Sequence, residues 1–321
     1  MEIVVAVLLM VFSIFLIVKG GDLFVSSSCY LSKKMHIPQI VFGATFVSLA
    51  TTLGELFISI FSSVNNSTEL AVGNAVGSFL CNIGLICGIG FIFASTTVEG
   101  NGKLKYYLLM FATLFVTILG FFLEIKTWQA IIMICITVVF FVFNYLDAKI
   151  FDKSKTPNIY ENQKPLWLII ILFLIGAICV SGGAYLLVDK VEFLAQKMGI
   201  SQQLVGLTVV AIGTSLPELA TMFTSIKKKT IELAIGNIIG ANILNITLIL
   251  GISKLISYNS QMPITKETAY VSLPLALIYS IIVSMCLLIK KKTYRWIGVV
   301  LFATYAIYIL FLILNSIYKF L

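Results

Sequence analysis

Two glutamates stand inside segments that are apolar enough to cross a membrane. Glu55 occurs in SLATTLGELFIS (48–59) and Glu218 in AIGTSLPELATM (211–222). Each follows a threonine, Thr51 or Thr214, by four residues, so on a helix the hydroxyl and the carboxylate share one face. A charged carboxylate at the bilayer centre costs at least ~2.5–3.5 kcal/mol. Such a residue must bind a proton, pair with a cationic side chain or bind a metal ion.

The neighbouring residues favour protons or inorganic cations. Neither apolar segment contains a lysine or arginine, and the lysines of KKK (227–229) belong to the loop that follows the second one. Carboxylate, hydroxyl, amide and carbonyl oxygens suit hard ions such as Ca²⁺ and Na⁺. Softer metals would be expected to recruit histidine or cysteine. Cys81 adjoins the polar residues described next, but its counterpart in the second copy is Leu244.

Further oxygen ligands recur every four residues in the next apolar segments, and this spacing predicts one polar stripe along each helix. The stripes comprise Asn74, Ser78 and Asn82 in one segment, and Asn237, Ala241 and Asn245 in the other. The amides could face the glutamates or simply hold helices together. A purely structural role between helices is most favoured for Asn74 and Asn237.

The glutamate segments also carry helix-breaking residues. Pro217 lacks a backbone N–H and obstructs the carbonyl one turn earlier, and Gly54 loosens the helix at the equivalent position. Either disturbance could free carbonyl oxygens near Thr214 and Thr51. Non-helical backbone at membrane depth requires another partner, and a bound cation would serve. We therefore expect broken helices around a central ion site.

These features repeat within the chain. Residues 43–88 align without gaps to residues 206–251 at a shift of 163, with 19 of 46 positions identical. The repeats include GNAVG (73–77) and GNIIG (236–240), G-x-x-x-G pairs of the kind that allow close helix contact. Duplication for packing alone is an alternative. It explains less well why the most polar positions within the membrane are among those repeated.

The composition places the chain in a bilayer. Its 321 residues are 60% hydrophobic and 11% charged, with a mean hydropathy of +1.05. The net charge of +8 comes from short lysine clusters between apolar segments. That distribution fits cytoplasmic loops of a membrane protein better than a nucleic-acid-binding face.

The expected fold is an all-α polytopic membrane protein with ten transmembrane helices in two inverted repeats. The predicted spans are 3–31, 38–63, 69–96, 104–123, 128–147, 166–189, 203–226, 231–256, 268–289 and 296–318. Residues 1–147 form the first five-helix repeat, 148–165 a linker and 166–321 the second repeat. An odd number of spans in each half inverts the second copy, as in many secondary transporters.

The basic residues predict the orientation. With both termini outside and the linker in the cytoplasm, cytoplasmic loops hold 15 of the 22 basic residues and external loops hold six. We expect a multi-pass protein of the cell membrane that acts as a monomer. Its partners would be inorganic cations and the lipid bilayer, without nucleic acid.

At these motifs the chain resembles the sodium/calcium exchanger family of the cation/calcium antiporter superfamily. ATTLGEL (50–56) and GNAVGSFLCN (73–82) are similar to the first repeat of that family, and GTSLPEL (213–219) and GNIIGANILN (236–245) to the second. The resemblance implies Na⁺/Ca²⁺ antiport with these ions as cargo and no cofactor. It implies that Glu55 and Glu218 bind both ions and that Thr51 and Thr214 contribute backbone oxygens to calcium. The further positions implied around the central and sodium sites are Ser48, Thr52, Ser78, Asn82, Ala211, Ser215, Ala241 and Asn245.

The chain departs from the family pattern at informative positions. Gly54 replaces the usual proline, Ala50 a glycine and Thr52 a serine, so the first copy could be shaped differently. Ala241 replaces a serine, which would weaken or rebuild one sodium site. Asn245 stands where potassium-dependent relatives tend to have aspartate, which makes potassium cotransport less favoured.

Three other functions compete with sodium/calcium exchange. A Ca²⁺/H⁺ antiporter could use the same glutamates as proton carriers. A passive channel is disfavoured by the inverted halves. An intramembrane enzyme lacks support, because the sole histidine, His36, lies in a loop and the sole arginine is Arg295. We therefore predict a transporter and not an enzyme.

Overall fold

The computed structural model describes residues 2–94, 103–150, 165–197, 211–257, 260–290 and 292–318. Regular structure in these ranges is helical, with one isolated β-bridge between Glu124 and Pro263. The α-helices up to the central gap are α1 (Glu2–Lys34), α2 (Gln39–Phe42), α3 (Ser48–Thr51), α4 (Leu53–Val64), α5 (Thr68–Leu80), α6 (Gly88–Phe93), α7 (Leu104–Gly120) and α8 (Thr127–Ile150). Those after it are α9 (Leu166–Lys197), α11 (Ala211–Thr214), α12 (Leu216–Lys228), α13 (Ile231–Leu244), α14 (Leu250–Ile256), α15 (Leu273–Met285) and α16 (Arg295–Tyr318).

Several α-helices continue directly into π-helical segments, in which the backbone hydrogen bond spans one residue more. These segments are η1 (Gly43–Val47), η2 (Cys81–Cys87), η5 (Asn245–Ile249), η6 (Thr268–Ser272) and η7 (Cys286–Lys290). Two of them, η2 and η5, lie where the predicted polar stripes end.

The helices are long and apolar enough to cross a bilayer many times. Within the described ranges seven helices qualify singly, and the bent pair Gln39–Thr51 and Leu53–Val64 gives an eighth span. The helix α7 is apolar but shorter, and residues 203–210 of the predicted span 203–226 lie outside the description. The all-α polytopic membrane architecture is confirmed, whereas the number ten stays a prediction.

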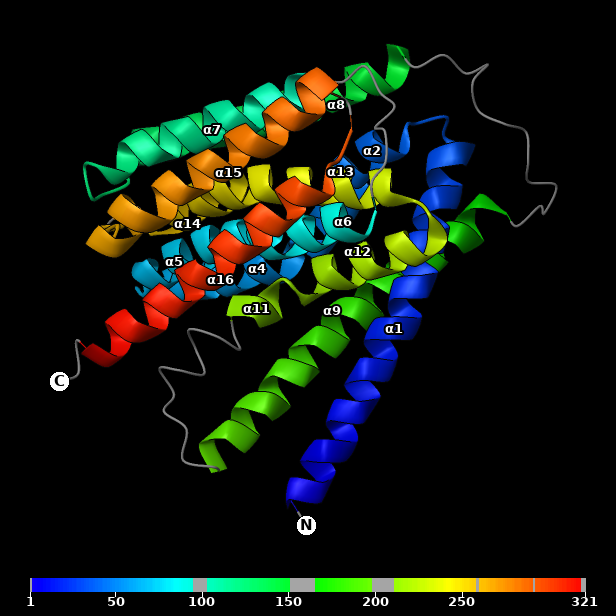
Figure 1. Ribbon diagram of the computed structural model, residues 1–321, viewed down its shortest axis with the longest axis horizontal. Coiled ribbons are helices and arrows are strands. Elements are labelled where there is room, and N and C mark those ends of the chain that lie inside the picture. The colour runs from blue at the N-terminus through cyan, green and yellow to red at the C-terminus, as the bar shows by residue number, and fades with distance from the viewer. Residues whose placement is uncertain are drawn as a thin grey trace.

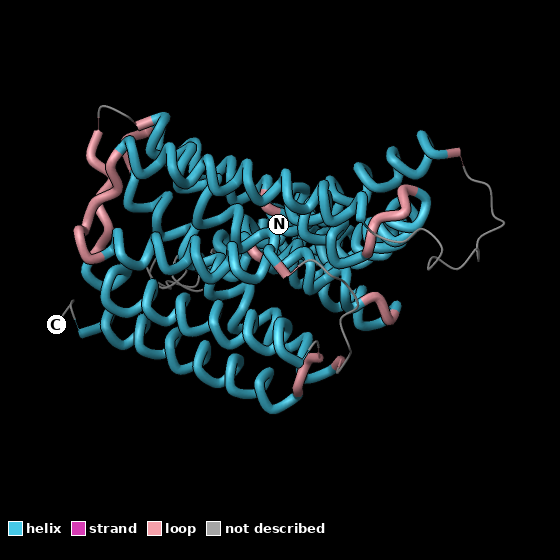
Figure 2. The backbone as a smooth tube through the Cα atoms, turned by 90° about the horizontal axis from the view of Figure 1, so that it is seen from above, coloured by secondary structure: helices cyan, strands magenta, loops and turns pink. Residues whose placement is uncertain are grey.

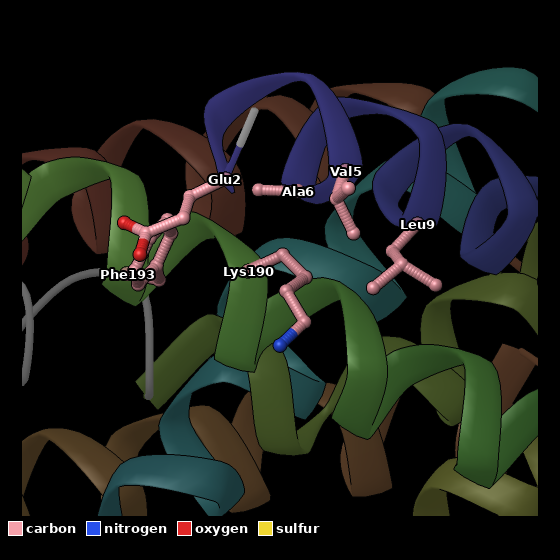
Figure 3. Close-up of a pocket in the computed structure, with 6 residues that line it drawn as sticks. All are labelled: Glu2, Val5, Ala6, Leu9, Lys190 and Phe193. Carbon is pink, nitrogen blue, oxygen red and sulfur yellow. The ribbon is translucent and has the colours of Figure 1, made fainter.

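Helices α1 and α9 form an antiparallel pair at the periphery (Figure 1). Small residues allow close approach, because a Cβ on Gly20 would lie 2.6 Å from the Cβ of Cys179 and one on Gly183 would lie 2.9 Å from the carbonyl of Ser13. A crevice of about 250 Å³ opens at one end of the pair, where Glu2 of α1 extends towards Phe193 of α9 (Figure 3). Gly20 belongs to the pair Gly20–Gly21 in the first half of the sequence, and Gly183 belongs to the similar pair Gly182–Gly183 in the second half.

The helix α13 runs through the centre of the bundle (Figure 1). In the apolar window of Ile231–Ile256, 94% of residues are buried. Any side chain at Gly236 or Gly240 would overlap the carbonyl of Ile40 or Ala44, so the predicted close contact at GNIIG is confirmed. For GNAVG (73–77), the equivalent partner segment, 203–207, lies outside the described residues.

Most loops gather at two ends of the bundle (Figure 2). At one end, Thr293 donates a hydrogen bond to the carbonyl of Ala94 at 3.0 Å. At the other, Ser260 donates to Asn66 at 2.9 Å, and the backbone N–H of Ile264 donates to the carbonyl of Leu123, also at 2.9 Å. These contacts join loops of the two sequence halves at each end of the bundle.

The two halves build one turn in the same way. The helices α4 and α12 are each followed within two residues by a residue with left-handed backbone, Asn66 (φ 59°) and Lys229 (φ 57°). The next N–H reaches back to a serine carbonyl in both cases, from Ser67 at 2.8 Å and from Thr230 at 2.9 Å. This is the Schellman arrangement, and its residues lie 163 positions apart, which is the shift of the sequence repeat.

Candidate cation site

Both glutamate segments break immediately before the glutamate-bearing helix. The helix α3 stops before Thr52 (φ −80°, ψ 0°), and α11 stops before Ser215 (φ −93°, ψ 7°). In the first copy the two halves are bent by 44°. Pro217 lies in the first turn of α12, where its missing N–H removes no helical hydrogen bond. Thr52 and Ser215 have similar backbone angles, so the helix breaks at the equivalent residue whether Gly54 or Pro217 follows.

These breaks place both carboxylates in the first turn of a helix. Glu55 and Glu218 occupy the first turns of α4 and α12, where the helix dipole favours negative charge. Both are 0% exposed, and they lie close enough to repel each other electrostatically. No oxygen of either carboxylate has a hydrogen-bond partner among the described residues. Two buried acids without partners are poorly satisfied by the protein alone.

Hydroxyl groups join the two copies beside these acids. The hydroxyl of Thr51 donates to Oδ1 of Asn237 at 3.0 Å, and the hydroxyls of Ser78 and Thr214 lie 3.2 Å apart. Ser78 lies next to the Glu55 carboxylate, and Thr51 next to that of Glu218. Each bond connects residues of different repeats, so the site depends on both.

Two amides complete the buried polar group. Asn82 and Asn245 are 0% exposed, and both side-chain polar atoms of each have no partner in the described part of the chain. They lie at the start of η2 and η5. Such π-helical segments are frequent at functional sites. Sequence reasoning found these amides from their spacing but did not anticipate the π-helical turns.

The remaining predicted residues differ in what they offer. The hydroxyls of Ser48 and Thr52 donate to the carbonyls of Ala44 and Ser48, at 2.9 and 2.7 Å, which leaves oxygen lone pairs. Ser215 is buried and its hydroxyl has no hydrogen-bond partner among the described residues. Ala241 is fully buried on α13.

Ala211 and Asn74 belong to the same two pairs of segments. Ala211 begins α11, but its side chain lies outside the described residues. Asn74 donates to the carbonyl of Glu55 at 3.1 Å and to the hydroxyl of Ser59 at 2.9 Å, which makes it a support of α4. The partner Ser59 was not anticipated from the sequence.

The arrangement offers oxygen ligands to a hard cation. It combines two carboxylates, two amides that have no partner in the described part of the chain, and hydroxyls at two helix breaks. No cluster of three or more histidine, cysteine, aspartate or glutamate residues occurs in the ranges described. The site therefore has two strong acids, and an ion held there would depend on neutral oxygens for its other ligands.

Comparisons with known proteins agree with this chemistry. The "Sodium/calcium exchanger protein" family matches residues 5–146 and 168–314. "Inner membrane protein YrbG" of Escherichia coli is 30% identical over 92% of this chain and 93% of its own length. "Sodium/calcium exchanger MaX1" of Methanosarcina acetivorans is 27% identical over 95% of this chain and 97% of its own.

A solved structure of the sodium-calcium exchanger NCX_Mj, soaked with Na⁺ and Sr²⁺, superimposes with a TM-score of 0.83. The two proteins are 26% identical over 95% of this chain and 98% of the other. The family comprises membrane transporters and not enzymes, as the sequence predicted. The chain therefore belongs to the sodium/calcium exchanger family.

Proposed function

We propose that the protein exchanges Na⁺ for Ca²⁺ across the cell membrane, with Glu55 and Glu218 as shared ligands of both ions. The observation that carries the proposal is that both carboxylates are fully buried, close to each other and without a hydrogen-bond partner within the described residues. A divalent cation between them would offset the repulsion and the lost hydration together. Sodium ions would replace the calcium ion because they also carry positive charge that balances the two carboxylates.

The other ligands follow from the two helix breaks. The backbone carbonyls of Thr51 and Thr214 are the last before each break and complete the calcium site in this proposal. The amide oxygens of Asn82 and Asn245 supply neutral ligands. The further positions assigned to the central and sodium sites are Ser48, Thr52, Ser78, Ala211 and Ser215. Ala241 provides no hydroxyl, so we expect weaker sodium binding on that side.

Alternating access would follow from an inverted repeat of five plus five helices. Support comes from helix breaks and left-handed caps that recur at the sequence shift of 163 residues, and from loops that sort into two ends. We assign residues 1–147 and 166–321 to the two repeats and residues 148–165 to a cytoplasmic linker, with both termini outside. One chain contains both glutamates, so a monomer suffices.

Transport into vesicles tests the proposal. Purified protein is reconstituted, and ⁴⁵Ca²⁺ uptake is followed with an outward Na⁺ gradient, with a pH gradient, or with neither. Uptake driven only by the Na⁺ gradient is expected. Uptake that ignores Na⁺ and follows the pH gradient would identify the Ca²⁺/H⁺ antiporter instead. Flux without any counter-ion would indicate a channel.

A further inference from the structure

A second cavity lies away from the ion site, between α8 and the first part of the broken second span. Its volume is about 640 Å³, within the range of small-molecule sites. The turn after α1 closes one end, while α2, η1 and α3 form one wall and α8 the other. The residues that line it are Met35, His36, Ile37, Val41, Thr45, Phe46, Leu49, Phe141, Asn144, Tyr145, Ala148 and Lys149.

The turn at the end of the cavity is firmly built. His36 has left-handed backbone (φ 54°), and its N–H donates to the carbonyl of Lys33 at 3.1 Å. The N–H of Ile37 reaches the carbonyl of Ser32 at 2.8 Å, which completes a Schellman cap on α1. Pro38 then precedes α2. Backbone hydrogen bonds thus fix the shape of the cavity mouth.

The two ends of the cavity differ chemically. Lys149 and His36 lie at the loop end, and the Nζ of Lys149 stands 4.7 Å from the centre of the Tyr145 ring. None of the twelve lining residues is acidic. Phe141 lies eight residues before Lys149 on α8, which is ~12 Å further into the membrane. There it is accompanied by Phe46 and Leu49, whose side chains are 45% and 40% exposed.

A cationic end joined to an apolar trough fits an amphiphile with a negatively charged head. The same loop end carries Lys34 in the last turn of α1, which adds positive charge near the mouth. Basic pockets between transmembrane helices on the cytoplasmic side recognise lipid phosphates. Asp147, the acid that precedes Lys149 by two residues on α8, is not among the residues that line the cavity.

We propose that this cavity binds an anionic phospholipid such as phosphatidylglycerol, with its phosphate at Lys149 and His36 and an acyl chain along Phe46, Leu49 and Phe141. The lipid would lie against the outer face of the segment η1–α3. The inner face of the same segment packs Ser48 against Gly240. The lipid would therefore stabilise the first half of the broken span from the side opposite the ion site. The site requires neither Na⁺ nor Ca²⁺, so it stands or falls independently of the proposed exchange.

Native mass spectrometry of the full chain in neutral detergent tests the proposal. The protein is titrated with phosphatidylglycerol or with phosphatidylcholine, and bound lipid is counted. Wild type is expected to retain phosphatidylglycerol preferentially. Lys149→Gln should weaken this binding about tenfold, because a charge-assisted bond to the phosphate is lost. Lys126→Gln, which removes an exposed lysine at the opposite end of α8, should bind as wild type does.

A second variant tests the trough itself. Ala148→Trp places a large ring in the cavity and should reduce retention of phosphatidylglycerol while Lys149 is present. Excess inorganic phosphate should displace little lipid, since it cannot fill the trough. Any of four results would overturn the proposal. Wild type could retain the two lipids equally, or Lys149→Gln and Lys126→Gln could lose phosphatidylglycerol to the same extent. Ala148→Trp could retain phosphatidylglycerol fully, or inorganic phosphate alone could displace it.

Discussion

Replacing Glu218 with glutamine should raise the stability of the ion-free protein and weaken calcium binding. At alkaline pH, where Glu218 of the ion-free protein does not keep a proton, its carboxylate is 0% exposed and unpartnered in the described structure, and it lies near Glu55. A charge so placed costs at least ~2.5–3.5 kcal/mol. A buried amide without a partner costs about 1–3 kcal/mol. Glu218→Gln should therefore raise ion-free stability by roughly 1 kcal/mol, from the difference between these costs.

Calcium should stabilise wild type and have little effect on Glu218→Gln. A ligand at a hundredfold excess over its Kd stabilises a folded protein by about 2.7 kcal/mol. Wild type should gain this increment, and Glu218→Gln should gain almost none, since one of two acidic ligands is absent. The variant would thus be the more stable protein without calcium and the less stable one with it.

Thermal unfolding in detergent, followed by tryptophan fluorescence with calcium or with a chelator, measures both effects. Glu69→Gln is a matched control, because Glu69 is an exposed acid in the first turn of α5 outside the candidate site. It should respond to calcium as wild type does. The reasoning fails if calcium stabilises Glu218→Gln as much as wild type, or if the ion-free variant is clearly less stable.

Three further substitutions test the elements that build the site. Gly240→Leu should destabilise the protein by about 1–3 kcal/mol through overpacking against Ala44 and Ser48, as measured by thermal unfolding; an unchanged midpoint would contradict the contact. Gly54→Pro should preserve ⁴⁵Ca²⁺ transport, because the equivalent Pro217 already fits the first helical turn; loss of transport in a folded variant would show that the two breaks differ. Ala241→Ser should lower the Na⁺ concentration needed to displace ⁴⁵Ca²⁺ severalfold by adding an oxygen ligand; an unchanged or higher Na⁺ requirement would remove Ala241 from the sodium site.

The sequence was informative about the site because the repeat marks it twice. Spacing of four residues predicted Thr51 beside Glu55, but the helix breaks between them at Thr52, and the Thr51 hydroxyl lies next to the Glu218 carboxylate instead. The paired asparagines Asn82 and Asn245 are buried and have no hydrogen-bond partner among the described residues. Pro217 located one helix break in advance. Gly54 marked the other less clearly, because glycine permits a bend without imposing one.

Other features depend on packing that local sequence does not encode. The bond between Thr51 and Asn237 joins residues 186 positions apart, and Asn74 turns out to support α4 through Ser59. The π-helical turn at Asn245 has no residue pattern that distinguishes it from an α-helix. The cavity of about 640 Å³ arises where residues 35–49 meet residues 141–149, so no single stretch of sequence indicates it.

Long-wavelength anomalous diffraction from calcium-bound crystals would locate the ion relative to the two glutamates. We expect one calcium peak in contact with both carboxylates, Glu55 and Glu218, at ligand distances of about 2.3–2.6 Å. The peak should weaken in crystals soaked with excess Na⁺. A calcium peak that contacts neither glutamate, or only one of them, would contradict the assignment of these two residues as the shared ion ligands.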